Sequence, residues 1–190
     1  EISSKKFALL ETSDVHEEKK QELPIALAIG ALKAQFIEEL LPSVVELSCD
    51  EIHIYMQSNL AKYRVSDKNI KRWEKIILAS CKQCKRNFLP KLKVWPNPQK
   101  MLEDCGMFEQ RFLLSPNASS QLYDTILNRK AIQLVIGAEK GLNESEELIF
   151  KKAGFRKLAL GQNILRSVTA AISSMTILGA KRFALLQEKE

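Results

Sequence analysis

Two glycine-containing loops in the last third of the chain hold the residue types best suited to ligand chemistry. Residues 137–141 (GAEKG) follow an apolar run, LVI, and residues 160–166 (LGQNILR) form the second loop. In open α/β sheets the ligand binds outside the carboxyl ends of the strands, where glycine lets the backbone approach it closely. The spacing therefore predicts a ligand crevice between these loops; the alternative is that the glycines only make tight turns.

Short apolar runs alternate with helical segments along the chain, and this pattern must position the two loops. It predicts βαβ units and a mostly parallel sheet. Ser66-Asp67 and Asn143 are the expected helix caps, and Pro42 is expected to kink or interrupt the first helix. The expected strands are residues 24–29, 51–55, 91–94, 111–114, 132–136 and 156–160. The expected helices are residues 34–47, 67–88, 98–104, 119–128, 144–153 and 165–183.

Length and composition are those of an ordinary globular protein. The 190 residues are 45% hydrophobic and 27% charged, which favours one domain with a substantial core. No apolar stretch approaches the roughly 20 residues of a membrane-spanning helix. The first residues, EISSKK, lack the apolar segment of a secretory signal. With four cysteines of which only two are closely spaced, a reducing compartment is expected.

The net charge of +6 is concentrated in basic clusters within residues 68–75, 82–93 and 151–157. Such clusters suit phosphate contacts with a polyanion, although a solvated helix face is an equally good explanation. Cys81 and Cys84 form a single C-x-x-C pair inside an expected helix, where core packing is favoured over zinc binding. His16 and His53 are isolated, which favours structural roles, so no metal site is expected.

Common nucleotide and hydrolase fingerprints are absent from the sequence. It contains no G-x-G-x-x-G, no G-x-x-x-x-G-K-[ST] and no G-x-S-x-G, so neither a Rossmann site, a P-loop nor a nucleophile elbow is supported.

Five segments, in order and spacing, resemble landmarks of one family. The segments are residues 46–52 (ELSCDEI), 71–73 (KRW), 79–86 (ASCKQCKR, followed by Pro90), 137–146 (GAEKGLNESE) and 160–170 (LGQNILRSVTA). They are similar to E-L-G-V-x-x-I, a basic-Arg-Trp helix start, A-x-E-Q-S-x-R with a following proline, G-P-E-G-G with an acidic helix start, and L-G-x-x-I-L-R-x-E-T-A. These are motifs of the RsmE family of 16S ribosomal RNA uracil-N3 methyltransferases, within the SPOUT superfamily, and the resemblance spans residues 23–183.

The resemblance implies an α/β SPOUT fold, in which a mostly parallel sheet is flanked by helices and the C-terminal part forms a deep trefoil knot. It places residues 22–190 in the SPOUT methyltransferase domain. Residues 1–21 would be a linker and the remnant of a PUA-like N-terminal barrel that is otherwise largely absent, with residues 6–10 as its last strand. It also implies a cytoplasmic homodimer that uses S-adenosylmethionine and acts on ribosomal RNA or the small ribosomal subunit.

The family match assigns expected roles to individual residues. Arg166 is the expected catalytic residue, stabilising negative charge on the uracil or holding a phosphate, with a salt-bridged structural role as the alternative. The expected cofactor-binding residues are Leu113, Leu114, Ile136, Gly137, Glu139, Gly141, Leu160, Gly161, Ile164 and Leu165. The expected RNA-binding residues are Gln83, Arg86, Lys82, Lys85 and Arg72, with Gln83 and Arg86 facing the site from the long helix.

Three positions depart from the family motifs. Ala138 replaces a proline, and Lys140 replaces a glycine, so that a side chain must fit at a position where positive φ is expected. Val168 replaces an acidic residue that could pair with Arg166 or accept a proton. The alternatives are therefore a divergent SPOUT homologue that binds RNA with weak or no methyltransferase activity, or a SPOUT methyltransferase acting on another RNA. A ribose 2'-O-methyltransferase is disfavoured, because the S-L-N-x-S-x-A motif of that branch is missing.

Overall fold

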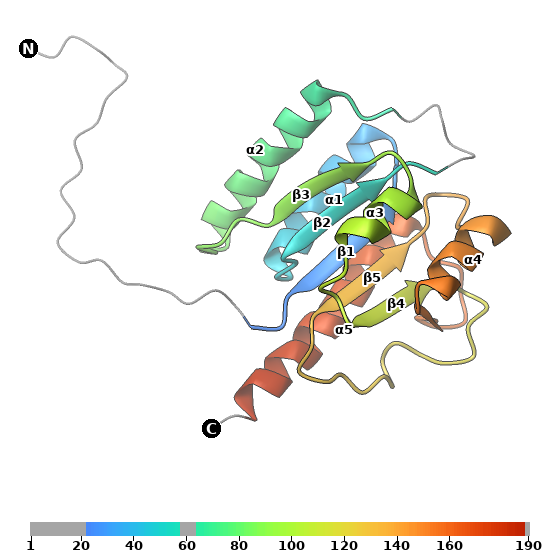
Figure 1. Ribbon diagram of the computed structural model, residues 1–190. Helices are drawn as coiled ribbons and strands as arrows, with labels where there is room; N and C mark the ends of the chain where they lie inside the picture. The colour runs from blue at the N-terminus through green and yellow to red at the C-terminus, as the bar shows by residue number, and fades with distance from the viewer. Residues whose placement is uncertain (1–21, 58–63, 189–190) are drawn as a thin grey trace, which may run out of the picture.

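A six-stranded sheet, parallel throughout, is the centre of the computed structural model, which describes residues 22–57 and 64–188 (Figure 1). The strand order is β3-β2-β1-β5-β4-β6, so β1 lies between β2 and β5. The strands are β1 (Ile25–Gly30), β2 (Glu51–Tyr55), β3 (Lys91–Trp95), β4 (Gln110–Leu114), β5 (Ile132–Ile136) and β6 (Arg156–Leu158). The helices are α1 (Ala34–Glu46), α2 (Asp67–Gln83), α3 (Pro98–Asp104), α4 (Glu144–Lys152) and α5 (Ser167–Gln187).

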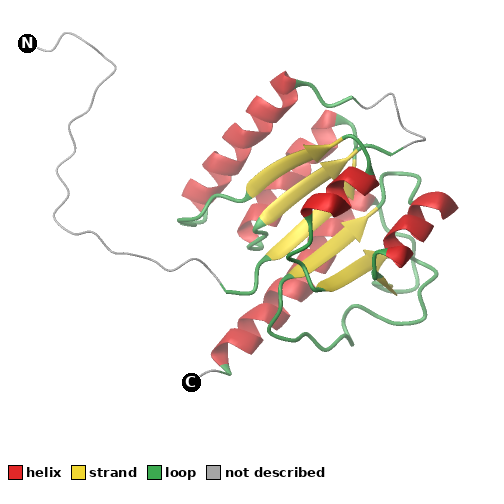
Figure 2. Cartoon of the chain, viewed as in Figure 1, coloured by secondary structure: helices red, strands yellow, loops and turns green. Residues whose placement is uncertain are grey.

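Helices cover both faces of the sheet (Figure 2). On one face α1, α2 and α5 bury a large apolar core around Leu27, Leu134 and Met175. On the other face α3 and α4 cover a smaller aromatic core that includes Phe108 and Phe150. Both faces of the central strands are buried, which explains why these strands read as continuous apolar runs in the sequence. The predicted α/β architecture is confirmed.

Most expected elements are present, and two expectations are wrong. Residues 119–128 form no helix; instead Leu122 N donates to Ala159 O at 2.8 Å, and Ala159 N donates to Ser120 O at 2.8 Å, so the segment pairs with the chain after β6. The α2 helix stops at Gln83, because Lys85 takes a φ of 57°. Pro42 lies inside α1 and does not interrupt it, so of the two expected effects only a kink stays a prediction.

The expected caps are confirmed. The side chains of Ser66 and Asn143 accept from Asn69 N and Glu146 N, and each belongs to a capping box. The expected strand at residues 6–10 and the linker before residue 22 lie outside the described residues. Among the described helices, none is long and apolar enough to cross a membrane.

Asp50 is the centre of a buried ionic cluster at the amino ends of the strands. Its carboxylate lies 2.8 Å from Arg86 Nη2 and 2.6 Å from Arg182 Nη1, and it accepts from Ile25 N at 2.9 Å. The two arginines also donate to the carbonyl groups at the end of α1, including Cys49 O and Ser48 O. The cluster therefore joins β1, the start of β2, α1 and α5.

Glu51 lies in a second buried polar cluster, with His53. Trp95 Nε1 can only donate, so His53 Nδ1 accepts from it at 3.2 Å and His53 Nε2 donates to Glu51 Oε2 at 3.1 Å. The His53 hydrogen bond, opposed by burial and helped by Lys93, lowers the pKa of the Glu51 carboxyl to about 2 from 4.5. His53 is fully buried and serves the fold, as expected.

Acidification is expected to destabilise the protein through Glu51. A carboxyl with a lowered pKa in the folded state contributes stability that is complete above its unfolded pKa and is lost as pH falls through its folded value. The free energy of unfolding should therefore fall between pH 4.5 and about 2, and Glu51→Gln should flatten part of this dependence. Urea unfolding at a series of pH values tests this. Glu103→Gln, in an exposed ion pair, should keep the wild-type profile, and an unchanged slope in Glu51→Gln would contradict the assignment.

Candidate cofactor pocket

A cavity of about 300 Å³ opens at the carboxyl ends of β4, β5 and β6. Three loops far apart in the sequence form it: the turn after β4, the loop after β5, and the segment that joins β6 to α5. Its walls are mainly apolar side chains, interrupted by backbone groups of the glycine loops. The lining residues are Leu114, Ser115, Pro116, Ile136, Gly137, Ala138, Glu139, Lys140, Gly141, Leu158, Leu160, Gly161, Asn163, Ile164, Leu165, Ser167 and Ala170.

Nine of the ten residues expected to bind the cofactor lie in this lining. The exception is Leu113, which is fully buried and points into the core beneath α3 and α4. The side chains of neighbouring strand residues alternate between faces, so Leu114 reaches the cavity and Leu113 cannot. Leu158 and Ala170 also line the cavity. Periodicity identifies both as core residues but does not distinguish a core wall from a pocket wall.

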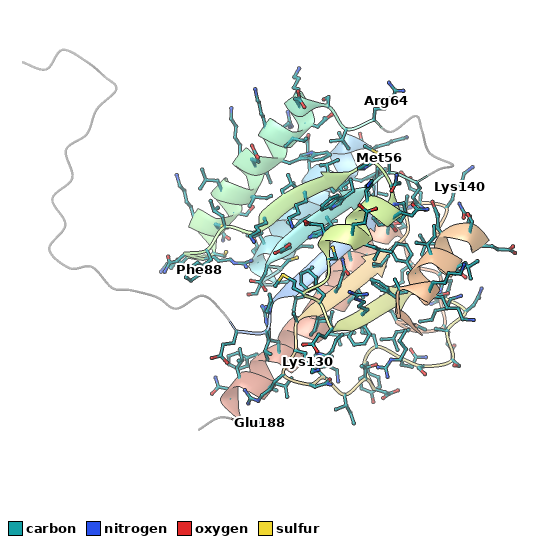
Figure 3. All side chains as sticks on the ribbon, viewed as in Figure 1. Met56, Arg64, Phe88, Lys130, Lys140 and Glu188 are labelled. Carbon is teal, nitrogen blue, oxygen red and sulfur yellow. The ribbon has the colours of Figure 1, made fainter. Side chains whose placement is uncertain are left out.

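The loop after β5 is a tight turn that depends on its two glycines. Ala138 O accepts from Gly141 N at 2.8 Å, and Gly141 has a φ of 72°. Lys140 is not among the described residues with positive φ. The expectation that a side chain at position 140 meets a backbone restriction is therefore wrong, because the restriction falls on Gly141. Lys140 extends from the rim of the cavity (Figure 3).

Gly137→Ala is expected to weaken cofactor binding by roughly tenfold. A Cβ at this position would lie 2.5 Å from Gly141 C and 2.8 Å from Gly141 Cα, so the turn would have to open. Because these contacts are backbone atoms, no rotamer change can relieve them. Calorimetric titration with S-adenosylmethionine measures the effect. Gly106→Ala is the matched control, because its Cβ would meet nothing within 4 Å; equal affinities of the two variants would refute the argument.

Arg166 occupies the N-cap position of α5, between the pocket residues Leu165 and Ser167. Its side chain is exposed and makes no capping hydrogen bond or ion pair within the described part of the chain. A cation at a helix N-terminus is unfavourable to the helix dipole, so this arginine does not stabilise the fold locally. The alternative of a salt-bridged structural residue finds no support here. Val168, where the family has an acid, packs against the core.

The five residues expected to bind RNA lie on or just after α2, at the sheet edge opposite the pocket (Figure 1). Lys82, Gln83 and Lys85 are exposed, and Arg72 is paired with Glu38 at 2.8 Å. Arg86 belongs to the Asp50 cluster. The expectation that Gln83 and Arg86 face the pocket is wrong within one chain, since α2 packs on α1 and ends near the amino ends of the strands.

The cysteines lie away from the pocket. Cys81 is buried in the main core and Cys84 is half-buried beside it. Within residues 22–57 and 64–188, no three His, Cys, Asp or Glu side chains gather as a metal-binding set. Two residues behind the pocket were not singled out by the sequence: Tyr55, which donates to Ile136 O at the end of β5, and Gln57, which donates to Gly141 O in the loop after β5. The sequence holds no signal for either role, because both depend on contacts between residues 81 to 84 positions apart.

Comparison with known proteins identifies relatives of the whole described fold. Residues 19–179 match the model of an RNA methyltransferase domain. Ribosomal RNA small subunit methyltransferase E from Mesomycoplasma hyopneumoniae is 32% identical over 176 residues, which cover 92% of this chain and 76% of that protein. SpoU methyltransferase AviRb from Streptomyces viridochromogenes, at 13% identity, has a TM-score of 0.59 over 86% of this chain and 62% of its own; this likeness shows the SPOUT fold alone.

A solved ribosomal RNA small subunit methyltransferase E from Neisseria gonorrhoeae, bound to S-adenosyl methionine, is 25% identical to this chain. The two superpose with a TM-score of 0.71 over 83% of this chain and 66% of the other, so this chain spans about two thirds of that protein's length. Sequence motifs, fold and relatives agree. The chain belongs to the RNA methyltransferase domain family and, within it, to the ribosomal RNA small subunit methyltransferase E (RsmE) family.

Proposed function

We propose that this chain transfers a methyl group from S-adenosylmethionine to N3 of a uridine in small-subunit (16S) ribosomal RNA. The observation that supports this function is the convergence of nine expected cofactor positions, from three separate loops, on one cavity. Family membership supports the reaction class, and the names of the relatives support the target RNA. The resemblance of the five sequence motifs to those of uracil-N3 methyltransferases supports N3 as the methylated atom.

The residues of the cavity fit the cofactor. Leu160, Ile164 and Leu165 offer apolar walls, and the backbone of the glycine loops offers amide and carbonyl groups that can bind an adenine edge. A volume of about 300 Å³ is at the lower end of the range for small-molecule sites. When bound, the cofactor supplies an electrophilic methyl group on sulfur. The main task of the protein is then to place the uracil in line with that group.

Arg166 is the residue proposed to assist the reaction. N3 must lose its proton to accept the methyl group. Negative charge therefore develops on the uracil before the transfer is complete. Arg166 itself does not line the cavity, but it lies between Leu165 and Ser167, which do, and its guanidinium is not engaged in capping α5. Such a cation, if turned toward the uracil, can stabilise that charge. Val168 supplies no carboxylate as a proton acceptor, so the proton must leave to another group or to solvent.

Homodimerisation is proposed from the outward face of α5. Phe183 is 65% exposed, and it borders a surface groove together with Thr176, Gly179 and Ala180. An exposed surface of small and aromatic residues on an apolar helix suits a two-fold interface.

We also propose a cytoplasmic location, RNA contacts by the exposed basic residues of α2, and a PUA-like domain origin for residues 1–21.

Calorimetric titration with S-adenosylmethionine tests the proposed function first. We expect saturable binding with one site per chain. A second experiment supplies 16S ribosomal RNA and labelled cofactor, and mass spectrometry of the nucleosides identifies the methylated atom. No cofactor binding would refute the proposal and favour a divergent homologue that binds RNA. Transfer to a ribose or to another RNA would refute the assigned substrate while leaving the enzyme class intact.

A further inference from the structure

Gln57 lies two residues after the end of β2, and its side chain reaches the loop after β5. Gln57 Oε1 accepts from Ala138 N at 2.7 Å, and Gln57 Nε2 donates to Gly141 O at 3.1 Å and to Glu146 Oε2 at 2.6 Å. The residue is only 5% exposed and does not line the cavity. Two of its partners, Ala138 and Gly141, are the ends of the hydrogen-bonded turn that does line it.

The surrounding structure makes room for this side chain. β1 separates β2 from β5, so a side chain from the end of β2 must pass the end of β1. β1 ends in Gly30, where a Cβ would lie 2.3 Å from Gln57 Oε1 and 2.6 Å from Ala138 N. Tyr55, the last residue of β2, donates its hydroxyl to Ile136 O at 2.8 Å, at the end of β5. The end of β5 and the loop after it are therefore held from behind by two side chains, Tyr55 and Gln57.

The hydrogen bonds require an amide at position 57. Its two N–H groups face a carbonyl and a carboxylate, while its oxygen faces an N–H, so both halves of the amide are used in one orientation. Glu146 Oε2 also accepts from Asn143 N at 3.1 Å, which fixes the carboxylate at the start of α4. A carboxylate at position 57 would face both Glu146 Oε2 and Gly141 O without a proton to share.

We propose that Gln57 is a positioning residue for the cofactor, which acts by fixing the turn of residues 137–141 in the shape that binds it. This inference rests on the proposed function. An amide that holds Ala138 N and Gly141 O from behind leaves the opposite side of the turn directed at the cavity. Without it, these two backbone groups are free to turn toward each other or toward solvent. The loop must then become ordered when the cofactor binds, which lowers the affinity for the cofactor.

The test compares Gln57→Glu with a matched glutamine at the other end of the sheet. Gln110 is 8% exposed and holds a loop in the same way: its Nε2 donates to Asn128 O and Lys130 O, and its Oε1 accepts from Asn128 N, each at 3.0 Å. Figure 3 shows Lys130 at the opposite end of the molecule from Lys140. Both variants bury a new carboxylate against two oxygen acceptors, which are Gly141 O and the Glu146 carboxylate for position 57 and two carbonyl groups for position 110. Only position 57 faces the cofactor loop.

We expect Gln57→Glu to weaken S-adenosylmethionine binding at least tenfold by calorimetry, and Gln110→Glu to bind within twofold of wild type. Gln57→Met, which removes the hydrogen bonds without adding charge, should also weaken binding at least fivefold and replaces Gln57→Glu if that variant does not fold. Gln57→Glu/Glu146→Gln supplies a donor to the new carboxylate and should recover at least threefold of the affinity lost by Gln57→Glu.

Each outcome separates the inference from the proposed function. A wild-type protein that binds no cofactor refutes the proposed function itself. Wild-type binding together with unchanged affinity in Gln57→Glu or Gln57→Met overturns the positioning role alone. An equal loss in Gln57→Glu and Gln110→Glu overturns it as well, because the effect would then follow general destabilisation. Recovery in the double variant supports it, since a merely unfolded site would not respond to a change at Glu146.

Discussion

Arg166→Ala is expected to lower the rate of methyl transfer to 16S ribosomal RNA by about 10²–10³-fold, the usual loss when a group that stabilises developing charge is removed. The side chain is exposed and has no partner in the described structure, so the melting temperature and cofactor affinity should remain near those of wild type. Single-turnover measurements with labelled cofactor give the rate of the chemical step.

Two variants control this experiment. Arg129→Ala removes an exposed arginine in the loop before β5, away from the pocket, and should keep full activity. Arg166→Lys keeps the positive charge but loses the planar guanidinium, so an intermediate rate is expected. Undiminished activity in Arg166→Ala would exclude the proposed role, and equal losses in Arg129→Ala and Arg166→Ala would indicate a general effect of charge on RNA binding.

Asp50→Ala is expected to lower the free energy of unfolding by about 3–5 kcal/mol. Removing one partner of a buried ion pair leaves the other charge without compensation. Here two arginines lose their partner together: the side chain of Arg182 is 2% exposed and that of Arg86 is 13% exposed. Ile25 N also loses its acceptor. Urea unfolding followed by circular dichroism measures the difference.

Glu103→Ala provides the comparison on the surface. Glu103 pairs with Lys100 at 2.8 Å, but both side chains are about 60% exposed, so solvent screens the pair and its loss should cost under about 1 kcal/mol. A similar small change in Asp50→Ala would show that the buried arginines find other acceptors among the carbonyl groups that they already contact. The Asp50 cluster would then contribute little to the free energy of unfolding.

The sequence predicts well where the local pattern and the tertiary structure agree. Strand β5 is buried on both faces, so its apolar run and its flanking glycine identify it without any knowledge of its neighbours. Asn143 begins α4 through a capping box formed within four residues. The two pocket loops can also be predicted from short stretches of sequence, because glycines at strand ends indicate a close approach of the backbone to a ligand. The predicted site residues that line the cavity are therefore those that depend on short stretches of chain.

Tertiary partners explain what the sequence does not show. Residues 119–128 have an acceptable helical pattern, but pairing with Ala159 satisfies their backbone instead. Arg86 lies among lysines in a basic segment, and only the position of Asp50, in another element, gives it a structural role. Gln57 is an unremarkable polar residue until Ala138 and Glu146 come beside it. No local pattern carries information about these long-range contacts.

The Arg182–Asp50 pair has a consequence for the order in which the molecule is completed during synthesis. The two residues are 132 positions apart, and Arg182 belongs to the last helix. A ribosome adds about 5–20 residues per second, so several seconds or more pass between the synthesis of Asp50 and that of Arg182, its second arginine partner. During that interval the amino-terminal strands hold an incompletely neutralised acid and lack the cover of α5. The emerging chain can then associate wrongly through the surface that α5 does not yet cover. This exposure ends when α5 is synthesised and packs on the sheet.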